Sequence, residues 1–508
     1  MIFARIKPLD AILATAEKKS LVRTLGPIQL TLLGVGAIIG TGIFVLTAAA
    51  AQKAGPGMMW SFVIAGGVCA FAALCYSEIA SMVPVSGSAY TYTYAVVGEL
   101  LAWMVGWALI LEYAVAASAV SVGWSGYFMG LMKSLTGLEL PQALAAGPTW
   151  TMNGFLPHAD FSHGVINIPA IVVALAVTAL LVVGTTESAR VNAVLVAIKV
   201  AALTAFIALT LPALDTGNFS PFAPNGWFGP EGTTGMGIVG AAASIFFAYV
   251  GFDAVSTAAE ETKNPQRNVP IGLIGSLALC TIFYLLVAAG AIGAIGAQPV
   301  IGLDGSVVAP GSKGFAEACA TAAHAGDLVC SNEALAHVLR SINWTTVGNA
   351  LGLAANLALP SVILMMMFGQ TRIFFVMARD GLLPEKLASI HPRFKTPHIV
   401  TMVTGVFVAI AAALLPVGQL ADISNSGTLF ASSWCRSLCW CSVSEIPTAL
   451  VRSVPPLCGS WRPWLGSVVS SSSSTCRSMP SWSCPSGAAW ACSFTSSMAT
   501  ARAMWVAA

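Results

Sequence analysis

Three ionisable residues lie inside long apolar stretches of the sequence, where a charged side chain costs about 3 kcal/mol and is a functional candidate by default. One is Lys199, in VLVAIKVAAL (194–203), a strong cation well inside a predicted membrane span, whereas Arg190 and Arg372 lie at span ends. Because burial disfavours the charged form of a lysine, Lys199 could take up and release a proton near neutral pH. It could equally serve as a fixed positive charge in place of a sodium ion. Because Lys199 lies about nine residues into the span, an ammonium group that simply extends to the membrane interface is the less favoured explanation.

The other two are acids, Glu112 in LILEYAVAA (109–117) and Asp253 in FFAYVGFDAV (246–255). Glu112 could pair with Lys199 or close a hydrogen-bond network. Asp253 follows a glycine-containing interruption of its span, so a strut that holds an unwound backbone is favoured over a direct substrate ligand. We therefore predict that both acids support a site without forming its centre.

The stretch GVGAIIGTGIFVLTA (34–48) places four glycines within nine residues, although each costs about 1 kcal/mol relative to alanine inside a helix. One explanation is close helix packing, for which the spacing of Gly36 and Gly40 is suitable. The other is a helix that unwinds, so that freed amides hold an anionic group and freed carbonyls a cation. By itself the stretch favours packing. Together with a second interrupted span at 246–254, it predicts half of a binding site, with residues 40–42 exposing backbone.

These groups must be positioned by membrane helices, because the composition excludes a soluble chain. Of the 508 residues, 56% are hydrophobic and only 9% are charged, and the mean hydropathy is +0.81. A soluble domain carries about 25% charged residues. The apolar runs of about 20 residues fit helices that cross a ~30 Å hydrocarbon core, and they lack the alternation of a membrane barrel. We predict spans at 27–52, 58–83, 94–130, 166–184, 190–213, 235–259, 270–297, 344–375, 397–416 and from 418 onward.

Lysines and arginines between the spans predict the orientation, because cytoplasmic loops carry an excess of them. With the N-terminus inside, thirteen lie on the cytoplasmic side and four on the outer side. Residues 1–26 hold five of these charges and no apolar core, so they predict a cytoplasmic tail without a cleavable signal peptide. We therefore expect a multi-pass protein of the cell inner (cytoplasmic) membrane with a cytoplasmic N-terminus.

Two cysteines, Cys319 and Cys330, share the long predicted outer loop near 298–343. Disulfides persist in loops that face the oxidising extracellular side of a membrane. The sequence alone supplies no geometry, so a disulfide and a pair of free thiols both remain open.

Four long motifs occur in order along the chain: GVGAIIGTGIFVLTA, PVSGSAYTYTYAVVGE (84–99), FFAYVGFDAVSTAAEETKNPQRNVPIGL (from 246) and GQTRIFFVMARDGLLP (369–384). Together they resemble the amino acid–polyamine–organocation superfamily, and more narrowly the bacterial members of its cationic amino acid transporter branch. The resemblance covers about residues 20–431. It implies an all-α integral membrane protein of the leucine-transporter-type fold, with an inverted 5+5 helix repeat and broken helices 1 and 6.

The same resemblance implies which residues bind substrate. The substrate carboxylate would meet backbone amides around Gly40, Thr41 and Gly42. The α-amine would meet carbonyls around five residues of the two breaks: Ile38, Ile39, Phe247, Ala248 and Val250. Phe247 would also act as an outer gate over the site. Lys199 matches the lysine that is taken as the proton-coupling group in several relatives.

The function implied is secondary active uptake of an L-amino acid by alternating access, without a cofactor and with the proton as coupling ion. Two alternatives stay open: a polyamine or amino acid antiporter of the same fold, and an amino acid sensor that does not transport. No enzyme is expected, since the sequence has no metal cluster, nucleophile constellation or phosphate loop. The net charge of +2 predicts no nucleic-acid role. Besides the lipid bilayer, a homodimer or a small single-span partner remains open, as do cationic, neutral and broad substrate specificity.

The last 77 residues do not fit this description. From 432 to 508 the chain holds seven of its twelve cysteines, seven of its fourteen tryptophans and twenty serines. Reading SEIPTALVRSVPP (444–456) from the third base of each codon permits Asp-Pro-Asp-Arg-Pro-Arg-Pro-Phe-Arg-Thr-Pro, which resembles the family's loop after span ten. We therefore predict a transporter core at 27–431, followed by an out-of-frame tail at 432–508 that replaces the end of helix 10 and helices 11–12.

Overall fold

The structure is a computed structural model whose described residues are 25–82, 88–96, 98–153, 156–161, 164–183, 189–231, 233, 235–253, 255, 262–303, 305–321, 323–324, 326–394 and 396–425. The predicted N-terminal tail up to residue 24 therefore lies outside this part of the chain. So does the tail at 432–508, for which the out-of-frame origin stays a prediction.

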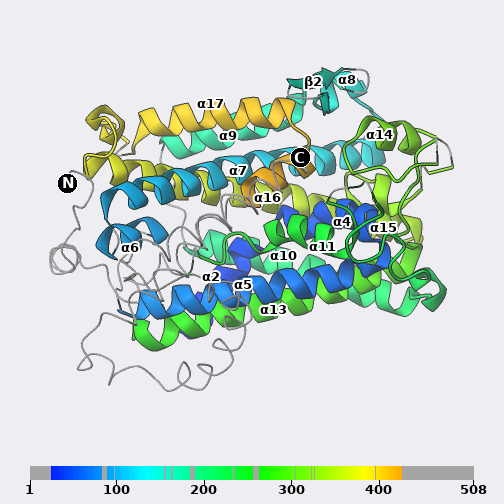
Figure 1. Ribbon diagram of the computed structural model, residues 1–508, viewed down its shortest axis with the longest axis horizontal. Helices are drawn as coiled ribbons and strands as arrows, with labels where there is room; N and C mark the ends of the chain where they lie inside the picture. Colours follow the sequence, from blue (N-terminus) through cyan, green and yellow to red (C-terminus); the bar gives the residue numbers. More distant parts are fainter. Residues whose placement is uncertain are drawn as a thin grey trace, which may run out of the picture.

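Helices that lie side by side, most of them long, form the body of the molecule (Figure 1). They are α2 (Pro27–Ile38), α3 (Thr41–Phe44), α4 (Leu46–Ala54), α5 (Met58–Met82), α7 (Glu99–Thr136), α9 (Ile168–Val183), α10 (Ala189–Thr210), α11 (Gly237–Ile245), α13 (Pro265–Ile295), α16 (Thr345–Arg379) and α17 (His398–Leu414). Residues 417–425 are also helical. Each helix overlaps a predicted span, and within the part of the chain described, five helical stretches are long and apolar enough to cross a membrane by themselves.

Shorter elements connect these helices. They are α6 (Ser88–Val96), α8 (Gln142–Ala145), α14 (Lys313–Cys319), α15 (Ala334–Ser341) and the 3₁₀ turns η1 (Gly55–Gly57), η2 (Leu211–Ala213), η3 (Thr216–Phe219), η4 (Phe246–Tyr249), η6 (Leu328–Cys330) and η7 (Glu385–Ala388). Figure 1 places α6 at one end of the bundle and α14 and α15 at the other.

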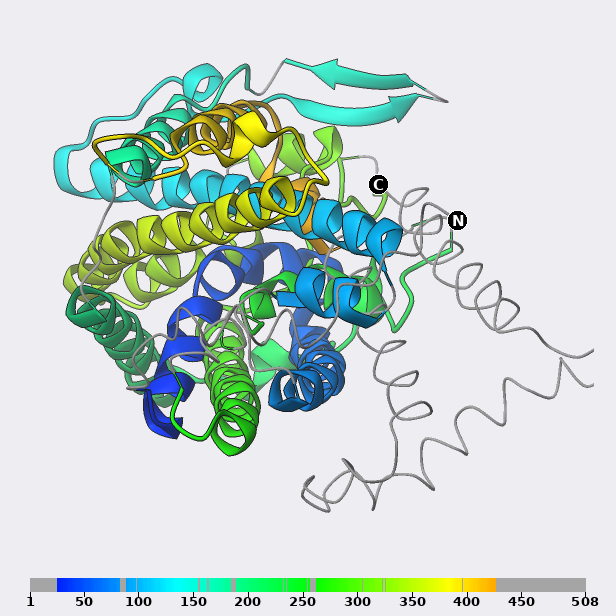
Figure 2. The same cartoon turned by 90° about the vertical axis from the view of Figure 1, so that its left-hand side faces the viewer.

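A β-hairpin that the sequence analysis did not predict lies in the loop before α9. Strands β1 (Thr149–Asn153) and β2 (Leu156–Asp160) pair antiparallel, with Thr149 opposite Asp160. Trp150 ties the hairpin to the bundle by donating from its indole N–H to the Leu414 carbonyl at 2.8 Å. Figure 2 shows the hairpin along one side of the helices. Its pairing depends on tertiary support, since an isolated two-stranded hairpin is only marginally stable in water.

The first predicted span is broken, as the fold prediction requires. Helix α2 ends before Ile39, whose backbone is extended (φ −70°, ψ 100°), and α3 begins two residues later at Thr41. The span that begins with α11 is broken as well. It narrows into η4, after which Val250 is extended (ψ 135°) and Gly251 has φ +103°. The prediction of broken helices 1 and 6 is confirmed.

Helices α7 and α16 run antiparallel against each other along much of their length. The rings of Trp107 and Phe374 lie 5.7 Å apart near one end, and the indole N–H of Trp124 donates to the Asn356 carbonyl at 2.9 Å further along. This register sets which residues of the two helices face each other. In the stretch between these contacts, it brings residues 116–120 of α7 opposite residues 362–366 of α16.

The loop between α13 and α16 is fastened to α4, the second half of the first broken span. Its two cysteines form the disulfide Cys319–Cys330, with the Cα atoms 5.5 Å apart. Of the two alternatives left open by the sequence, the structure shows the disulfide and not the free thiols. The buried amide of Gln52 on α4 donates to the carbonyls of Val300 and Val308 at 2.8 and 2.9 Å. The loop therefore moves with α4 unless these bonds break.

Candidate functional site

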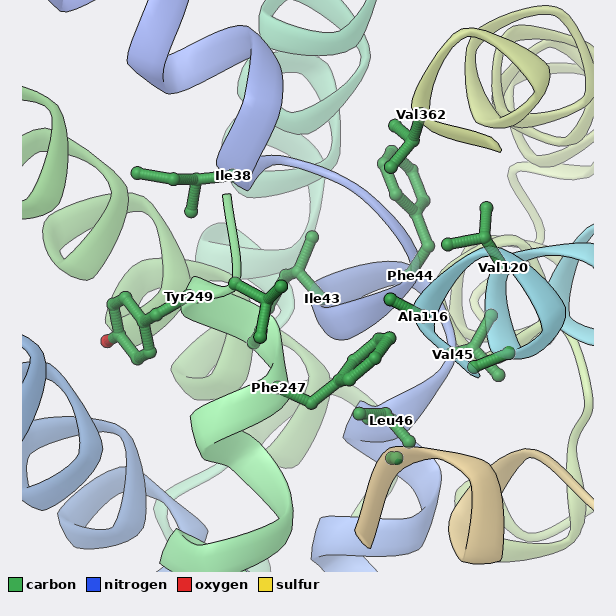
Figure 3. Close-up of a cluster of buried hydrophobic side chains, with 14 of the residues drawn as sticks. Ile38, Ile43, Phe44, Val45, Leu46, Ala116, Val120, Phe247, Tyr249 and Val362 are labelled. Carbon is green, nitrogen blue, oxygen red and sulfur yellow. The ribbon is translucent and has the colours of Figure 1, made fainter. Parts of the chain in front are cut away.

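A small cavity lies where the two broken spans meet α7 and α16. Its lining residues are Ala37, Ile38, Gly40, Gly42, Ala116, Val120, Phe247, Val250, Val362 and Met366. In Figure 3 Phe247 projects from its own span into the space between the first broken span and the helix that carries Ala116 and Val120, with Val362 beyond. Every side chain in the lining is apolar.

Most of the backbone positions predicted from the sequence come together here. Five of the eight predicted substrate-binding residues line the cavity: Ile38, Gly40, Gly42, Phe247 and Val250. Ala248 lies directly against Gly42. Ile39 is buried but is not among the lining residues, and of Thr41 only the backbone is described, as the first residue of α3. The amides that begin a helix have no acceptor within it, so this end of α3 is suited to an anionic group.

Two glycines allow the broken spans to touch each other. A Cβ atom on Gly42 would lie 2.2 Å from the Cα of Ala248, and one on Gly251 would lie 3.0 Å from the Ala37 carbonyl oxygen. Gly251 also adopts φ +103°, a conformation that side-chain-bearing residues avoid. Close packing and helix unwinding therefore occur together here, because Gly42, which follows the unwound residues of one span, packs against Ala248 in the turn before the break of the other.

Carbonyls from both breaks accept hydrogen bonds from one tyrosine that the sequence analysis did not single out. The Tyr284 hydroxyl on α13 lies 3.0 Å from the Ile38 oxygen and 2.9 Å from the Ala248 oxygen. A hydroxyl carries one proton, so it can satisfy only one of these carbonyls at a time. A buried tyrosine in an apolar span usually has a hydrogen-bond partner, which is the signal that could have pointed to Tyr284.

Lys199 is buried and contacts the first broken span directly. Its side chain is 2% exposed, and Nζ donates to the carbonyl of Gly36 on α2 at 3.2 Å. Gly36 has no side chain to hold α10 away, since a Cβ there would lie 2.4 Å from a methyl group of Val196. The ammonium group therefore reaches the α2 backbone one helical turn before the break at residues 39–40.

The two membrane acids do not line the cavity. Asp253 accepts a hydrogen bond from the Tyr113 hydroxyl at 2.7 Å, which joins the chain just after the second break to α7. Glu112 is buried, and its backbone carbonyl accepts from the Ser424 hydroxyl at 3.2 Å. The Tyr113 contact supports the role of Asp253 as a strut. The cavity walls on α7 and α16 were missed because the sequence does not show which faces of these helices meet.

Comparison with known proteins agrees with this architecture. A family model described as "Amino acid permease" matches residues 25–446. The chain is 44% identical over 430 residues to the branched-chain amino acid permease BcaP of Bacillus subtilis (strain 168), covering 85% of this chain and 83% of the relative. It is 40% identical over 428 residues to the methylthioribose transporter of the same organism, covering 84% and 82%.

More distant relatives follow the same pattern. Cationic amino acid transporter 2, vacuolar, of Arabidopsis thaliana is 33% identical over 459 residues, covering 89% of this chain and 63% of the relative. A solved structure of a Na⁺-coupled sialic acid symporter superposes with a TM-score of 0.52 at 12% identity, covering 84% and 83% of the two chains. That likeness shows the fold, and the family match shows a transporter and not an enzyme. This chain is a multi-pass membrane protein that belongs to the amino acid permease family of the amino acid–polyamine–organocation superfamily.

Proposed function

We propose that this permease takes up neutral, apolar L-amino acids by alternating access and couples the uptake to protons. The observation that carries the specificity is the cavity lining, in which every side chain is apolar. A cationic side chain would need an acid near its end, and neither Glu112 nor Asp253 lines the cavity. The 44% identical relative is named a branched-chain amino acid permease, which agrees with an apolar side-chain pocket.

In this proposal the backbone of the two breaks binds the groups that all amino acids share. The α-carboxylate binds the amides of residues 40–42 at the start of α3. The α-ammonium binds carbonyls at the two breaks, including those of Ile38 and Ala248, which Tyr284 contacts without substrate. Phe247 lies over the cavity as the outer gate, and the substrate side chain lies between α7 and α16.

Lys199 is proposed as the proton-coupling group, because it bonds the half of the broken span that must move when the site opens to the other side. A neutral lysine would hold the Gly36 carbonyl less strongly than an ammonium group does. Loss of the proton would therefore loosen α10 from α2. Alternating access needs such a bistable contact between two parts of the bundle.

We propose that the protein lies in the cell inner (cytoplasmic) membrane with its N-terminus in the cytoplasm. The excess of lysines and arginines between spans supports it. The disulfide Cys319–Cys330 also supports it, because disulfides persist outside the cytoplasm. Its loop fastens to α4, so α2 begins at the opposite, cytoplasmic end.

A panel of ligands tests the substrate class. In a thermal-shift assay of the purified protein we expect leucine, isoleucine and valine to raise the melting temperature, with a stabilisation of about 2.7 kcal/mol at a hundred times Kd. Leucinamide, which lacks the carboxylate, should have little effect, as should lysine, arginine and glutamate. A larger shift with arginine than with leucine would contradict the apolar assignment. Methylthioribose belongs in the panel because of the 40% identical relative.

A second prediction concerns Tyr284→Phe, which removes the hydroxyl that contacts both breaks. Without substrate the variant should be less stable by roughly 1–3 kcal/mol, since buried carbonyls lose their donor. With leucine the difference should shrink, because the substrate ammonium would then satisfy the same carbonyls. Melting temperatures of both proteins, with and without saturating leucine, check this. An equal loss in both conditions would show that the ammonium does not bind at these carbonyls.

A further inference from the structure

The first broken span has a second interruption that the fold prediction did not include. Between α3 and α4 the backbone of Val45 is distorted from regular helical values, with φ −119° at ψ −47°. The amide of Ala48 bonds the Val45 carbonyl at 3.3 Å in place of the Phe44 carbonyl that a regular α-helix would use. Helix α3 is thus a four-residue segment with an interruption on each side, so its direction must be set from outside.

Two hydroxyl groups occupy the carbonyls that this second interruption releases. The Thr47 hydroxyl donates to the Ile43 carbonyl at 2.6 Å, a contact that often bends helices. The Tyr127 hydroxyl on α7 donates to the Phe44 carbonyl at 2.8 Å. Tyr127 is fully buried, and its ring meets that of Phe44 edge to face with centroids 5.9 Å apart. Of the two hydroxyls, that of Tyr127 fixes the end of α3 relative to another helix.

We infer that Tyr127 is a positioning residue that aims α3 at the substrate. Its hydroxyl holds the C-terminal end of α3 against α7, and the N-terminal end of the same segment carries the amides of residues 40–42. Because α3 is only four residues long, a displacement of the Phe44 backbone also displaces the amides of residues 40–42. The inference rests on the proposed binding of the substrate carboxylate by those amides.

The same hydroxyl connects α3 to the outer loop. The backbone N–H of Leu335, in the first turn of α15, donates to the Tyr127 oxygen at 3.4 Å. Helix α15 is fastened to α16 by Arg340, whose Nε donates to Asn349 Oδ1 at 3.0 Å, and Gly130 of α7 leaves space for the Glu333 carboxylate that pairs with Arg340. The outer loop therefore helps to fix the Tyr127 hydroxyl, and the hydroxyl in turn fixes the helix α3 whose N-terminal amides are proposed to bind the carboxylate.

The test is Tyr127→Phe, which keeps the ring and removes only the hydroxyl. In the full-length protein reconstituted in vesicles, we expect the KM for leucine to rise about fivefold to tenfold with the maximal rate largely kept, as for one lost hydrogen bond. The preference for leucine over leucinamide in competition should fall by a similar factor, because the misaligned amides serve the carboxylate. A merely structural role would lower the amount of folded protein and leave this preference unchanged.

Tyr90→Phe is the matched control, because its hydroxyl bonds Asp380 at 3.1 Å, away from the broken spans. It should keep both the KM and the preference for leucine. Thr47→Val removes the other hydroxyl at the same interruption. It should raise the KM and lower the preference for leucine, as Tyr127→Phe does, and it replaces that variant in the test if Tyr127→Phe does not fold. If Tyr127→Phe and Thr47→Val match the control while the parent transports leucine, the inference is wrong and the proposed function stands. If the parent neither binds nor transports amino acids, both fail.

Discussion

Replacing Lys199 by methionine is expected to abolish uptake driven by a pH gradient while leaving amino acid binding measurable. Methionine keeps the length and apolar stem of the side chain but removes the group that donates to Gly36 at 3.2 Å. Because Lys199 does not line the cavity, the substrate contacts themselves remain. In the proposed mechanism a proton switches the contact between α10 and α2, and the variant lacks that contact, so its binding should no longer depend on pH.

Vesicles that contain the parent or the variant measure this outcome directly. Leucine uptake is followed with and without an imposed pH gradient, and binding is followed by thermal shift across the pH range. Lys313→Met is the matched control, since Lys313, at the start of α14, is half-exposed and pairs with Asp160 of β2 at 3.3 Å. If the Lys199 variant still responds to the gradient as the parent does, another group couples the proton. Counterflow without any gradient in the parent would favour the antiporter alternative.

Gly42→Ala is expected to raise the KM for leucine strongly or abolish uptake. The added methyl group would lie 2.2 Å from the Cα of Ala248, and the obstacle is backbone that cannot rotate away. Forcing one methylene into a packed interior costs roughly 1–3 kcal/mol, which corresponds to about 5-fold to 150-fold in affinity. The two breaks would separate, and the amides and carbonyls that they contribute would no longer converge on one substrate.

The control for this prediction is Gly67→Ala on α5, where a Cβ would meet nothing within 4 Å. That change should keep the KM, because alanine is the better helix former by about 1 kcal/mol and no neighbour obstructs it. Uptake rates and the melting temperatures with leucine should be compared for both variants. Equal KM values for the two alanine variants would show that the contact between the breaks is not required for binding.

The glycine-rich stretch shows how far sequence reasoning reaches in this protein. The number and spacing of its glycines allowed two explanations, helix packing and helix unwinding, and the second interrupted span decided for unwinding. The structure adds that both occur in the same few residues, since Gly42 directly follows the unwound residues 39–40 and packs against Ala248. A sequence cannot show this, because the contact joins residues about 200 positions apart whose approach depends on how the two spans cross.

The cavity walls on α7 and α16 illustrate the opposite case. Both helices are apolar on all sides, since they are buried or face lipid, so no periodicity marks the face that lines a site. Only the packing register places Ala116 and Val120 across from Val362 and Met366. The proposed apolar substrate class rests on these four side chains, and specificity was open before their facing was known.

By itself, the sequence determined that this chain crosses a membrane as helices, that two spans are interrupted, and that a lysine lies within a third. These features follow from local composition, because apolar length, glycine density and a buried charge have physical consequences wherever they occur. The tertiary structure alone decided that Lys199 bonds Gly36, that Tyr284 and Tyr127 occupy released carbonyls, and that Cys319 pairs with Cys330. The reason is that a hydrogen bond or a disulfide needs two groups within a few ångströms of each other, and that distance is set by the packing of whole helices.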